Sequence, residues 1–299
     1  MGQVWSKLES LPVKNEWKFA LVNHVSHILS FWGPSLAFML IRRFKLFQKY
    51  KIQPDADPAP KLVTEALRHV VQNIYKIPLL SVAFYRFLAS GRRVHSARQG
   101  QQTGRETGSE PSKEKEAGDV ERGWAALRFG GKLPSAWTTI WQVAVAYMGY
   151  DLMFYWSHRW LHRKENLVGG YAAVHKMHHR FYAAVGFASN YEHTIEGLMQ
   201  LLNWYLPLGF AGWCNRGRGG MHVSTVFWYS CFRWLETVDA HCGYDLPFSP
   251  FSFIPLFGGA LAHDYHHSAV FGNYGATIIW DRLMGTEVPA FRKLRLARS

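Results

Sequence analysis

The sequence predicts an all-α protein, in which an integral membrane helical bundle carries a histidine-rich helical domain. Long apolar segments are the first indication, because a helix of about 20 apolar residues crosses a bilayer. The composition is the second. Of the 299 residues, 16% are aromatic and only 18% are charged, whereas soluble domains have about 25% charged residues. Clustered histidines at helical spacing are the third indication.

The first predicted membrane helix covers residues 19–41 and follows an N-terminal tail at residues 1–18. The basic residues within 42–51 come directly after it, so the positive-inside rule places that loop in the cytoplasm. The tail has no apolar core of the kind found in a cleavable signal peptide. Residues 1–6 fit the myristoylation pattern. We interpret this match as fortuitous, because the N-terminus would lie in the lumen.

The remainder of the membrane region, residues 19–90, predicts a second helix. Its apolar part is residues 74–89, which contain Lys76, Pro78 and Arg86. Both a kinked span and a helix at the membrane interface therefore remain open. Residues 91–123 have no Leu, Ile, Met, Phe, Trp or Tyr. Such a segment cannot bury enough apolar surface to offset its ordering entropy, so we expect a disordered polar linker.

The histidine-rich domain is predicted at residues 124–290, followed by a basic tail at 291–299. Its apolar segments are residues 133–157, 198–213, 221–238 and 247–262. The first of them runs directly into a histidine cluster, and the second and third suggest a helical hairpin. With two crossings before this domain, all the histidine clusters would lie on the cytoplasmic face.

Eight histidines of this domain form three clusters with the spacings HxxxH, HxxHH and HxxHH. They are His158, His162, His175, His178, His179, His263, His266 and His267. One such pair alone would most simply be a surface pair or a packed pair. Triplets are different, because crowded imidazoles suffer desolvation or charge repulsion unless something binds them. Imidazole is the commonest metal ligand, and eight ligands exceed the four of one tetrahedral ion. The count therefore favours two ions.

Other kinds of site find no support in the sequence. The three cysteines form no CxxC pair, which argues against a cysteine-bound zinc ion and a disulfide framework. Neither a dinucleotide-binding glycine motif nor a P-loop is present. If the chemistry needs electrons, another protein would therefore have to supply them. The net charge of +13 could indicate nucleic acid. The basic residues flank apolar runs, however, which fits a membrane surface, and we expect no nucleic-acid partner.

Residues 235–247 read LETVDAHCGYDLP, and residues 263–267 read HDYHH, followed by Gly272–Tyr274 and Trp280–Arg282. Together with the three histidine clusters, these segments resemble the C-4 methylsterol monooxygenases of the fatty acid hydroxylase/sterol desaturase superfamily. Residues 189–197 resemble a further segment of that family, although threonine stands where the family usually has proline. The close resemblance covers about residues 137–287, so that 124–290 would be the catalytic domain.

The resemblance implies that the eight clustered histidines bind iron. It adds His241 as a ninth ligand and His193 as a further candidate. Asp151 precedes His158 by seven residues, on the same predicted helix face, where it could accept a hydrogen bond from the outer ring N–H. Asp245 follows His241 by four residues. It would be either a carboxylate ligand or a hydrogen-bond partner of a ligand.

By the same resemblance, the activity would be O2-dependent oxidation of a sterol C-4 methyl group to alcohol, aldehyde and carboxylate at two non-haem iron ions. Electrons from NAD(P)H would arrive through cytochrome b5 and its reductase. The enzyme would be a multi-pass protein of the endoplasmic reticulum membrane, with its site facing the cytoplasm and its sterol drawn from the membrane lipid. The same di-iron site in a C-5 sterol desaturase or a fatty acid hydroxylase is an alternative. A non-enzymatic zinc-binding membrane protein is another.

Overall fold

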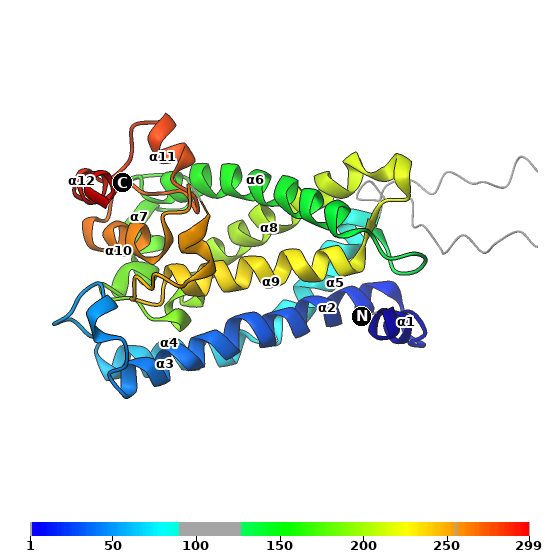
Figure 1. Cartoon of the computed structure of the whole chain (residues 1–299), viewed down its shortest axis with the longest axis horizontal. Coiled ribbons are helices and arrows are strands. Elements are labelled where there is room, and N and C mark those ends of the chain that lie inside the picture. The colour runs from blue at the N-terminus through cyan, green and yellow to red at the C-terminus, as the bar shows by residue number, and fades with distance from the viewer. Residues whose placement is uncertain (1, 90–126, 255, 299) are drawn as a thin grey trace, which may run out of the picture.

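Long helices lie side by side and give the molecule its elongated shape (Figure 1). The computed structural model describes residues 2–89, 127–254 and 256–298. The first long helix is continuous from Asn15 to Arg43 and consists of α2 (Asn15–His27), the π-helical turn η1 (Ile28–Trp32) and α3 (Gly33–Arg43). The others are α4 (Pro60–Asn73), α5 (Lys76–Ala89), α6 (Ala136–Leu161), α8 (Thr194–Cys214) and α9 (Val223–Ala240). The predicted linker, 91–123, lies outside the described residues.

The helix from Asn15 to Arg43 is, among the described residues, the one that is long and apolar enough to cross a membrane. It contains the predicted span 19–41, and apolar side chains such as Leu29 and Leu40 are exposed on it. Helices α6 and α8 contain further predicted apolar segments but do not reach the same combination of length and hydropathy. The helical character of the fold is thus confirmed, whereas the multi-pass membrane bundle stays a prediction.

Helices α6 and α8 pack closely where Gly149 faces Pro207. A Cβ atom at position 149 would lie 2.8 Å from the Cβ of Pro207, so a larger residue would push the helices apart. Pro207 lies inside α8, where it removes one backbone hydrogen bond. At the start of α6, the Ser135 side chain accepts a hydrogen bond from the Thr138 N–H at 3.0 Å and caps the helix.

Aromatic side chains dominate the core between these helices. Phe19 of α2, Tyr150 of α6, Tyr205 of α8 and Tyr229 of α9 are all buried in one cluster. Arg233 of α9 lies in their midst, with its guanidinium carbon 3.6 Å from the centre of the Tyr150 ring. The face of an aromatic ring attracts a cation, and an ion pair with the buried Glu236 balances the charge.

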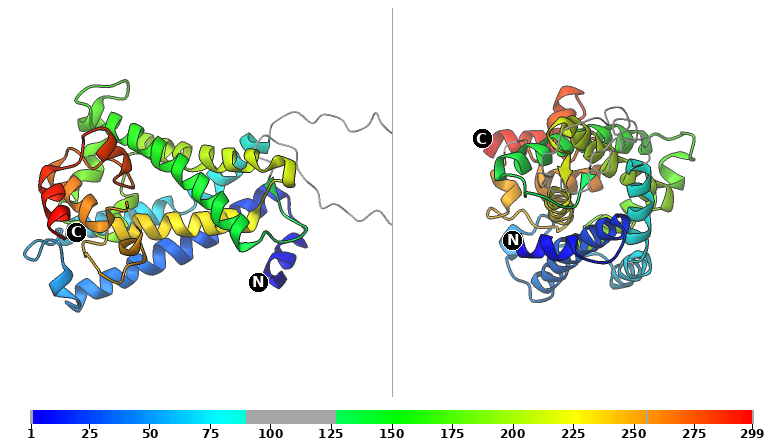
Figure 2. Two further views of the ribbon diagram at one scale, coloured as in Figure 1. Left: turned by 45° about the horizontal axis from the view of Figure 1, so that its top comes forward. Right: turned by 90° about the vertical axis from the view of Figure 1, so that its right-hand side faces the viewer.

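Short elements close one end of the bundle, where α3 also ends and α4 begins (Figures 1 and 2). They are η2 (Gln48–Tyr50), α7 (Gly170–Ala173), η3 (His175–Arg180), η4 (Gly186–Asn190), η6 (Pro250–Phe253), α10 (Gly259–Ala269), α11 (Ile279–Leu283) and α12 (Pro289–Arg298). The opposite end holds α1 (Gly2–Glu9), η5 (Arg216–Arg218), and the parallel strands β1 (Leu127–Arg128) and β2 (Met221–His222).

The two predicted tails are part of the folded structure. Residues 2–9 form α1, and the Lys18 ammonium of α2 donates a hydrogen bond to the Glu9 carbonyl at 2.6 Å. At the other terminus, the basic residues belong to α12, whose Phe291 is buried against Tyr265 of α10. The sequence patterns alone indicated no packing partner for either segment.

Candidate metal centre

Nine histidines meet in two groups at the closed end of the bundle. Within each group, the potential ligand atoms all lie within 4.8 Å of one another. The five-histidine cluster consists of His158, His162, His175, His179 and His266. The four-histidine cluster consists of His178, His241, His263 and His267. The structure therefore brings together the eight residues of the three sequence motifs and His241, the ninth candidate.

Each HxxHH triplet contributes to both clusters. His263 and His267 of α10 belong to the four-histidine cluster, whereas His266 belongs to the five-histidine cluster. An α-helix turns by about 100° per residue, so positions i and i+4 point nearly the same way and position i+3 points to one side. The other triplet divides in the same manner, with His178 separated from its two neighbours. That triplet lies on the 3₁₀ helix η3, not on the α-helix that its spacing predicts.

In both clusters the Nε2 atoms converge. In the five-histidine cluster, His175 Nε2 lies 3.0 Å from the Nε2 atoms of His158 and His179. In the four-histidine cluster, His263 Nε2 lies 2.9 Å from that of His241 and 3.1 Å from that of His267. Histidine nitrogens bind an ion such as zinc at about 2.0–2.1 Å, which places neighbouring ligand nitrogens roughly 3 Å apart. These donor sets fit metal ions of that size.

The other ring nitrogen, Nδ1, of three cluster histidines forms a hydrogen bond with a backbone carbonyl outside the clusters. His158 Nδ1 lies 2.8 Å from the Tyr274 carbonyl oxygen, and His241 Nδ1 lies 2.8 Å from that of Thr237. His266 Nδ1 lies 2.6 Å from the Gly272 carbonyl oxygen. Because a carbonyl only accepts, each Nδ1 must carry the proton and donate it. The Nε2 lone pairs then point into the clusters, as metal binding requires.

Burial keeps these imidazoles uncharged. Removal from water lowers the pKa of His178 to about 4. Burial, with repulsion from His178, lowers the pKa of His241 to about 3. A neutral imidazole is the form that binds a metal ion. At neutral pH, no proton has to leave these two rings before an ion can bind.

Glu196 is a candidate residue of the site that the sequence analysis missed. Its Oε1 lies 2.7 Å from His175 Nδ1, and both side chains are buried. Burial, with repulsion from Glu192, raises the pKa of Glu196, while a cation bound at the far nitrogen of His175 would favour the carboxylate. Carboxylates in this position orient metal-bound histidines and increase their basicity. The signal was present, because Glu196 lies in the segment 189–197 that resembles the family.

The expectation for Asp151 is wrong. Its carboxylate accepts hydrogen bonds from the backbone N–H and hydroxyl of Thr277, at 2.9 Å and 2.5 Å, while His158 bonds to the Tyr274 carbonyl instead. Asp151 therefore fixes the loop before α11 and supports the site only indirectly. Seven residues of α-helix also separate it from His158 by about 10 Å along the axis, too far for a direct hydrogen bond.

Two other candidates lie outside both clusters. His193 caps the start of α8, where its Nδ1 accepts a hydrogen bond from the Ile195 N–H at 3.2 Å. Asp245 lines a separate pocket with Lys49 and Asp264. Neither residue belongs to a group of ligand atoms in the described structure. His193 does, however, line the main cavity beside the four-histidine cluster.

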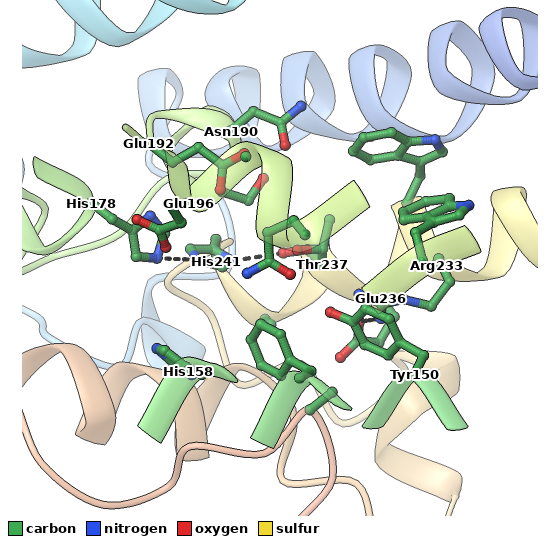
Figure 3. Close-up of a pocket in the computed structure, with 18 of the residues that line it drawn as sticks. Tyr150, His158, His178, Asn190, Glu192, Glu196, Arg233, Glu236, Thr237 and His241 are labelled. Carbon is green, nitrogen blue, oxygen red and sulfur yellow. Dashed lines mark hydrogen bonds and ion pairs between the residues drawn. The ribbon is translucent and has the colours of Figure 1, made fainter. Parts of the chain in front are cut away.

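That cavity, of about 250 Å³, extends from the clusters into the bundle. Five of the nine histidines line it, namely His158, His175, His178, His241 and His263. In Figure 3, His158, His178 and His241 lie on one side of the pocket, while Tyr150 and Arg233 lie on the other. Both histidine clusters are therefore accessible from a single space whose wall is mostly apolar.

Comparison with known proteins identifies the kind of protein that has this arrangement. Residues 143–286 match the fatty acid hydroxylase family. The very-long-chain aldehyde decarbonylase GL1-8 of Oryza sativa subsp. indica is 32% identical, over 87% of this chain and 82% of its own. The methylsterol monooxygenase erg25B of Aspergillus fumigatus is 28% identical, over 95% of this chain and 83% of its own. The chain belongs to the fatty acid hydroxylase family.

Membership of the fatty acid hydroxylase family confirms the resemblance that the histidine motifs and the segment 235–247 predict. It makes the chain an oxidoreductase of the monooxygenase type. The methylsterol monooxygenase 1 of Rattus norvegicus, 27% identical over 93% of this chain and 84% of its own, is a further relative of this kind. No solved structure matches the chain significantly.

Proposed function

We propose that this fatty acid hydroxylase family member oxidises the C-4 methyl group of 4-methylsterols, to the alcohol and then to the aldehyde and carboxylate. The observation that carries the proposal is the pair of histidine clusters opening on one apolar cavity, in a chain with several methylsterol monooxygenases among its relatives. A sterol is a neutral lipid of low polarity, which suits such a cavity.

The five-histidine and four-histidine clusters would each hold one iron ion. Iron bound there would supply the O2 activation that oxidation of an unactivated C–H bond requires. The protein's own part is to aim the Nε2 atoms inward, through the outer hydrogen bonds to Tyr274, Thr237 and Gly272. The cavity would hold the methyl group beside His158 and His241, one from each cluster.

Glu192 is the residue best placed to supply a proton. It lines the cavity near Asn190 and Glu196 (Figure 3). Burial raises its pKa to about 8, so the carboxyl group stays largely protonated at neutral pH. Inserting one oxygen atom of O2 into a C–H bond and reducing the other to water consumes two electrons and two protons. The Glu192 carboxyl would donate one of these protons toward the reacting oxygen.

Electrons would come from NAD(P)H through cytochrome b5 and its reductase. The enzyme would lie in the endoplasmic reticulum membrane as a multi-pass protein with its site on the cytoplasmic side. This orientation is supported by the basic segment 42–51, which follows the candidate span Asn15–Arg43 and lies at the same end of the bundle as the histidine clusters (Figure 1). Basic residues flanking a span favour the cytoplasmic side.

The test is sterol profiling in cells that lack C-4 methylsterol oxidation. Expression of this chain should remove accumulated 4,4-dimethylsterols and yield C-4 oxidised products. A His178→Ala, His263→Ala double variant, which lacks two residues of the four-histidine cluster, should be inactive although present in the membrane. Unchanged 4,4-dimethylsterols with a well-expressed, iron-loaded protein would refute the sterol assignment.

A second candidate substrate is a long-chain aldehyde. Two rice relatives, GL1-11 and GL1-8, bear the name very-long-chain aldehyde decarbonylase and are 30% and 32% identical to this chain. The same apolar cavity would suit such a chain. Feeding labelled long-chain aldehyde to the expressing cells, and looking for a shortened hydrocarbon, distinguishes the two substrates.

A further inference from the structure

Two elements that are far apart in the sequence form one part of the cavity wall. From α4 and α5 come His69, Val70, Asn73, Ile74, Lys76, Ile77 and Leu80. From α8 come Thr194, Glu196, Gly197, Leu198, Gln200, Leu201, Trp204 and Tyr205. We propose that the gap between the α4–α5 bend and the first half of α8 is a lateral portal, through which a neutral lipid passes from the bilayer into the cavity. This inference rests on the proposed lipid oxidation.

The portal has a fixed contact at one side. Ser81 of α5 and Tyr205 of α8 share a hydrogen bond of 2.9 Å between their hydroxyl oxygens. The Phe84 ring stacks on the ring of the same tyrosine, with 4.7 Å between their centres. Ser81 and Tyr205 are buried, and Phe84 is half-buried. They hold α5 against α8 beyond the portal and set its inner limit.

A second contact lies at the side nearer the clusters. Arg180, which follows the histidines of η3, donates a hydrogen bond to Glu65 of α4 at 2.6 Å. The Tyr191 hydroxyl, just before α8, donates to the same carboxylate at 2.5 Å. Between these two contacts, within the part of the chain that the structure describes, no hydrogen bond or ion pair joins residues 66–80 to α8. The gap can therefore widen without breaking a polar contact.

The outer surface of the protein beside the gap also carries apolar side chains. Val71, Tyr75 and Leu79 flank the lining residues of α4 and α5 and are 50%, 58% and 55% exposed. Leu198, which itself lines the cavity, is 49% exposed, and Leu202 one turn further along α8 is 44% exposed. Exposed apolar side chains gathered beside a cavity favour contact with lipid or another apolar partner. Their continuity with the cavity favours a lipid that goes inside.

The sparse charge of these two elements narrows the class of lipid. Residues 69–80 contain one charged residue, Lys76, and the first half of α8 contains one, Glu196, which is buried against His175. A polyanionic group such as a phosphate or coenzyme A ester would need several cationic partners. The portal thus fits a membrane-dissolved lipid without an anionic head group. A sterol and a long-chain aldehyde share that chemistry.

The experiment is photolabelling of the full chain in bilayer discs with two probes, a diazirine sterol and a diazirine long-chain aldehyde. The expected result is labelling of residues 69–80 and 194–205. A Leu198→Trp variant, which fills the gap with a bulky ring, should reduce labelling of Trp204 inside the cavity about tenfold. The matched control is Leu36→Trp on α3, because Leu36 is also 49% exposed but lies outside the cavity lining.

The outcomes separate the portal from the proposed substrate. Labelling of these segments by the aldehyde probe alone supports the portal and overturns the sterol assignment. Labelling confined to other helices, or equal labelling of Trp204 in the Leu198→Trp and Leu36→Trp variants, overturns the portal. Ile77→Trp, on the α5 side, should repeat the effect of Leu198→Trp. Iron content and thermal unfolding of each variant establish that it is folded, and a misfolded variant is replaced by its partner across the gap.

Discussion

The Nε2 atom of His241 lies 2.9 Å from that of His263, although the two residues belong to different helices and to different sequence motifs. His241 ends α9 and has no histidine neighbour in sequence, yet it completes the four-histidine cluster. Without it, that cluster would keep three ligands while the other cluster keeps five. The two proposed ions therefore depend differently on this residue.

Replacing His241 with alanine is expected to remove the ion of the four-histidine cluster and leave the other. Iron content measured by mass spectrometry should fall from about two toward about one per chain, because the four-histidine cluster then keeps three ligands while the five-histidine cluster keeps all of its own. His193→Ala is the matched control, since His193 lies outside both clusters, and it should retain full iron content. Equal iron loss in both variants would contradict the ligand assignment.

Replacing Glu196 with glutamine should weaken metal binding through His175. Loss of such a carboxylate partner typically costs 10–100-fold in metal affinity. Competition with a coloured chelator measures this change directly. Asp245→Asn is the control, because Asp245 lies outside both clusters and lines a separate pocket. That variant should keep its metal affinity. Glu192→Gln, which removes the proposed proton donor, should lower the rate of product formation.

The metal-free protein should become unstable as the solution is acidified. Unfolded histidines titrate near pH 6.5, whereas burial lowers the pKa of His178 to about 4 and, with His178 nearby, that of His241 to about 3. The folded state is therefore fully favoured above pH 6.5 and loses stability as the pH falls toward 4 and 3, because the unfolded state binds protons first.

Thermal unfolding of chelator-treated protein between pH 7.5 and 4 tests this dependence. The unfolding temperature should decline below pH 6.5, and iron should shift the decline to lower pH, because bound ligands resist protonation. His241→Gln removes one of the titrating groups and should make the decline shallower. A flat profile from pH 7.5 to 4 would show that these histidines are not buried as neutral rings.

The buried pair of Arg233 and Glu236 should be sensitive to loss of one partner. Arg233→Met leaves an unpaired carboxylate among aromatic rings, and breaking such a pair typically costs about 3–5 kcal/mol. The double variant Arg233→Met, Glu236→Leu should recover most of that loss, since no charge then remains buried. Denaturant unfolding of the three proteins measures the coupling, and additive losses would contradict it.

Much of the metal centre could be predicted because its ligands lie in short local motifs. The spacing of His263, His266 and His267 specifies their directions within a single helix. The meeting of the two triplets in two shared clusters could not be predicted from spacing, since it depends on how η3 and α10 approach each other. Glu196 was missed for a related reason, because it meets His175 only after α8 has packed beside η3.

Helical periodicity also led to one wrong prediction, the hydrogen bond between Asp151 and His158. Asp151 does share a helix face with His158. A shared face, however, does not bring two residues together when they are two helical turns apart along the axis. Thr277, from a loop remote in sequence, donates hydrogen bonds to the Asp151 carboxylate instead. The membrane prediction has a comparable limit. Apolar composition marks both lipid-facing and core helices, and only the segment Asn15–Arg43 combines it with sufficient length among the described residues.

The two clusters are structurally coupled, because each HxxHH triplet contributes histidines to both of them. His178 and His179 are adjacent in the chain but serve different clusters, and so do His266 and His267. An ion bound in one cluster would immobilise η3 and α10, and would thereby position the residues that the other cluster needs. We therefore expect an ion in one cluster to strengthen binding in the other, so that the His241→Ala variant should hold its remaining ion more weakly than the unchanged protein does. The distance between the two ions would then be limited by the single peptide bond that joins two adjacent histidines, rather than by the packing of whole helices.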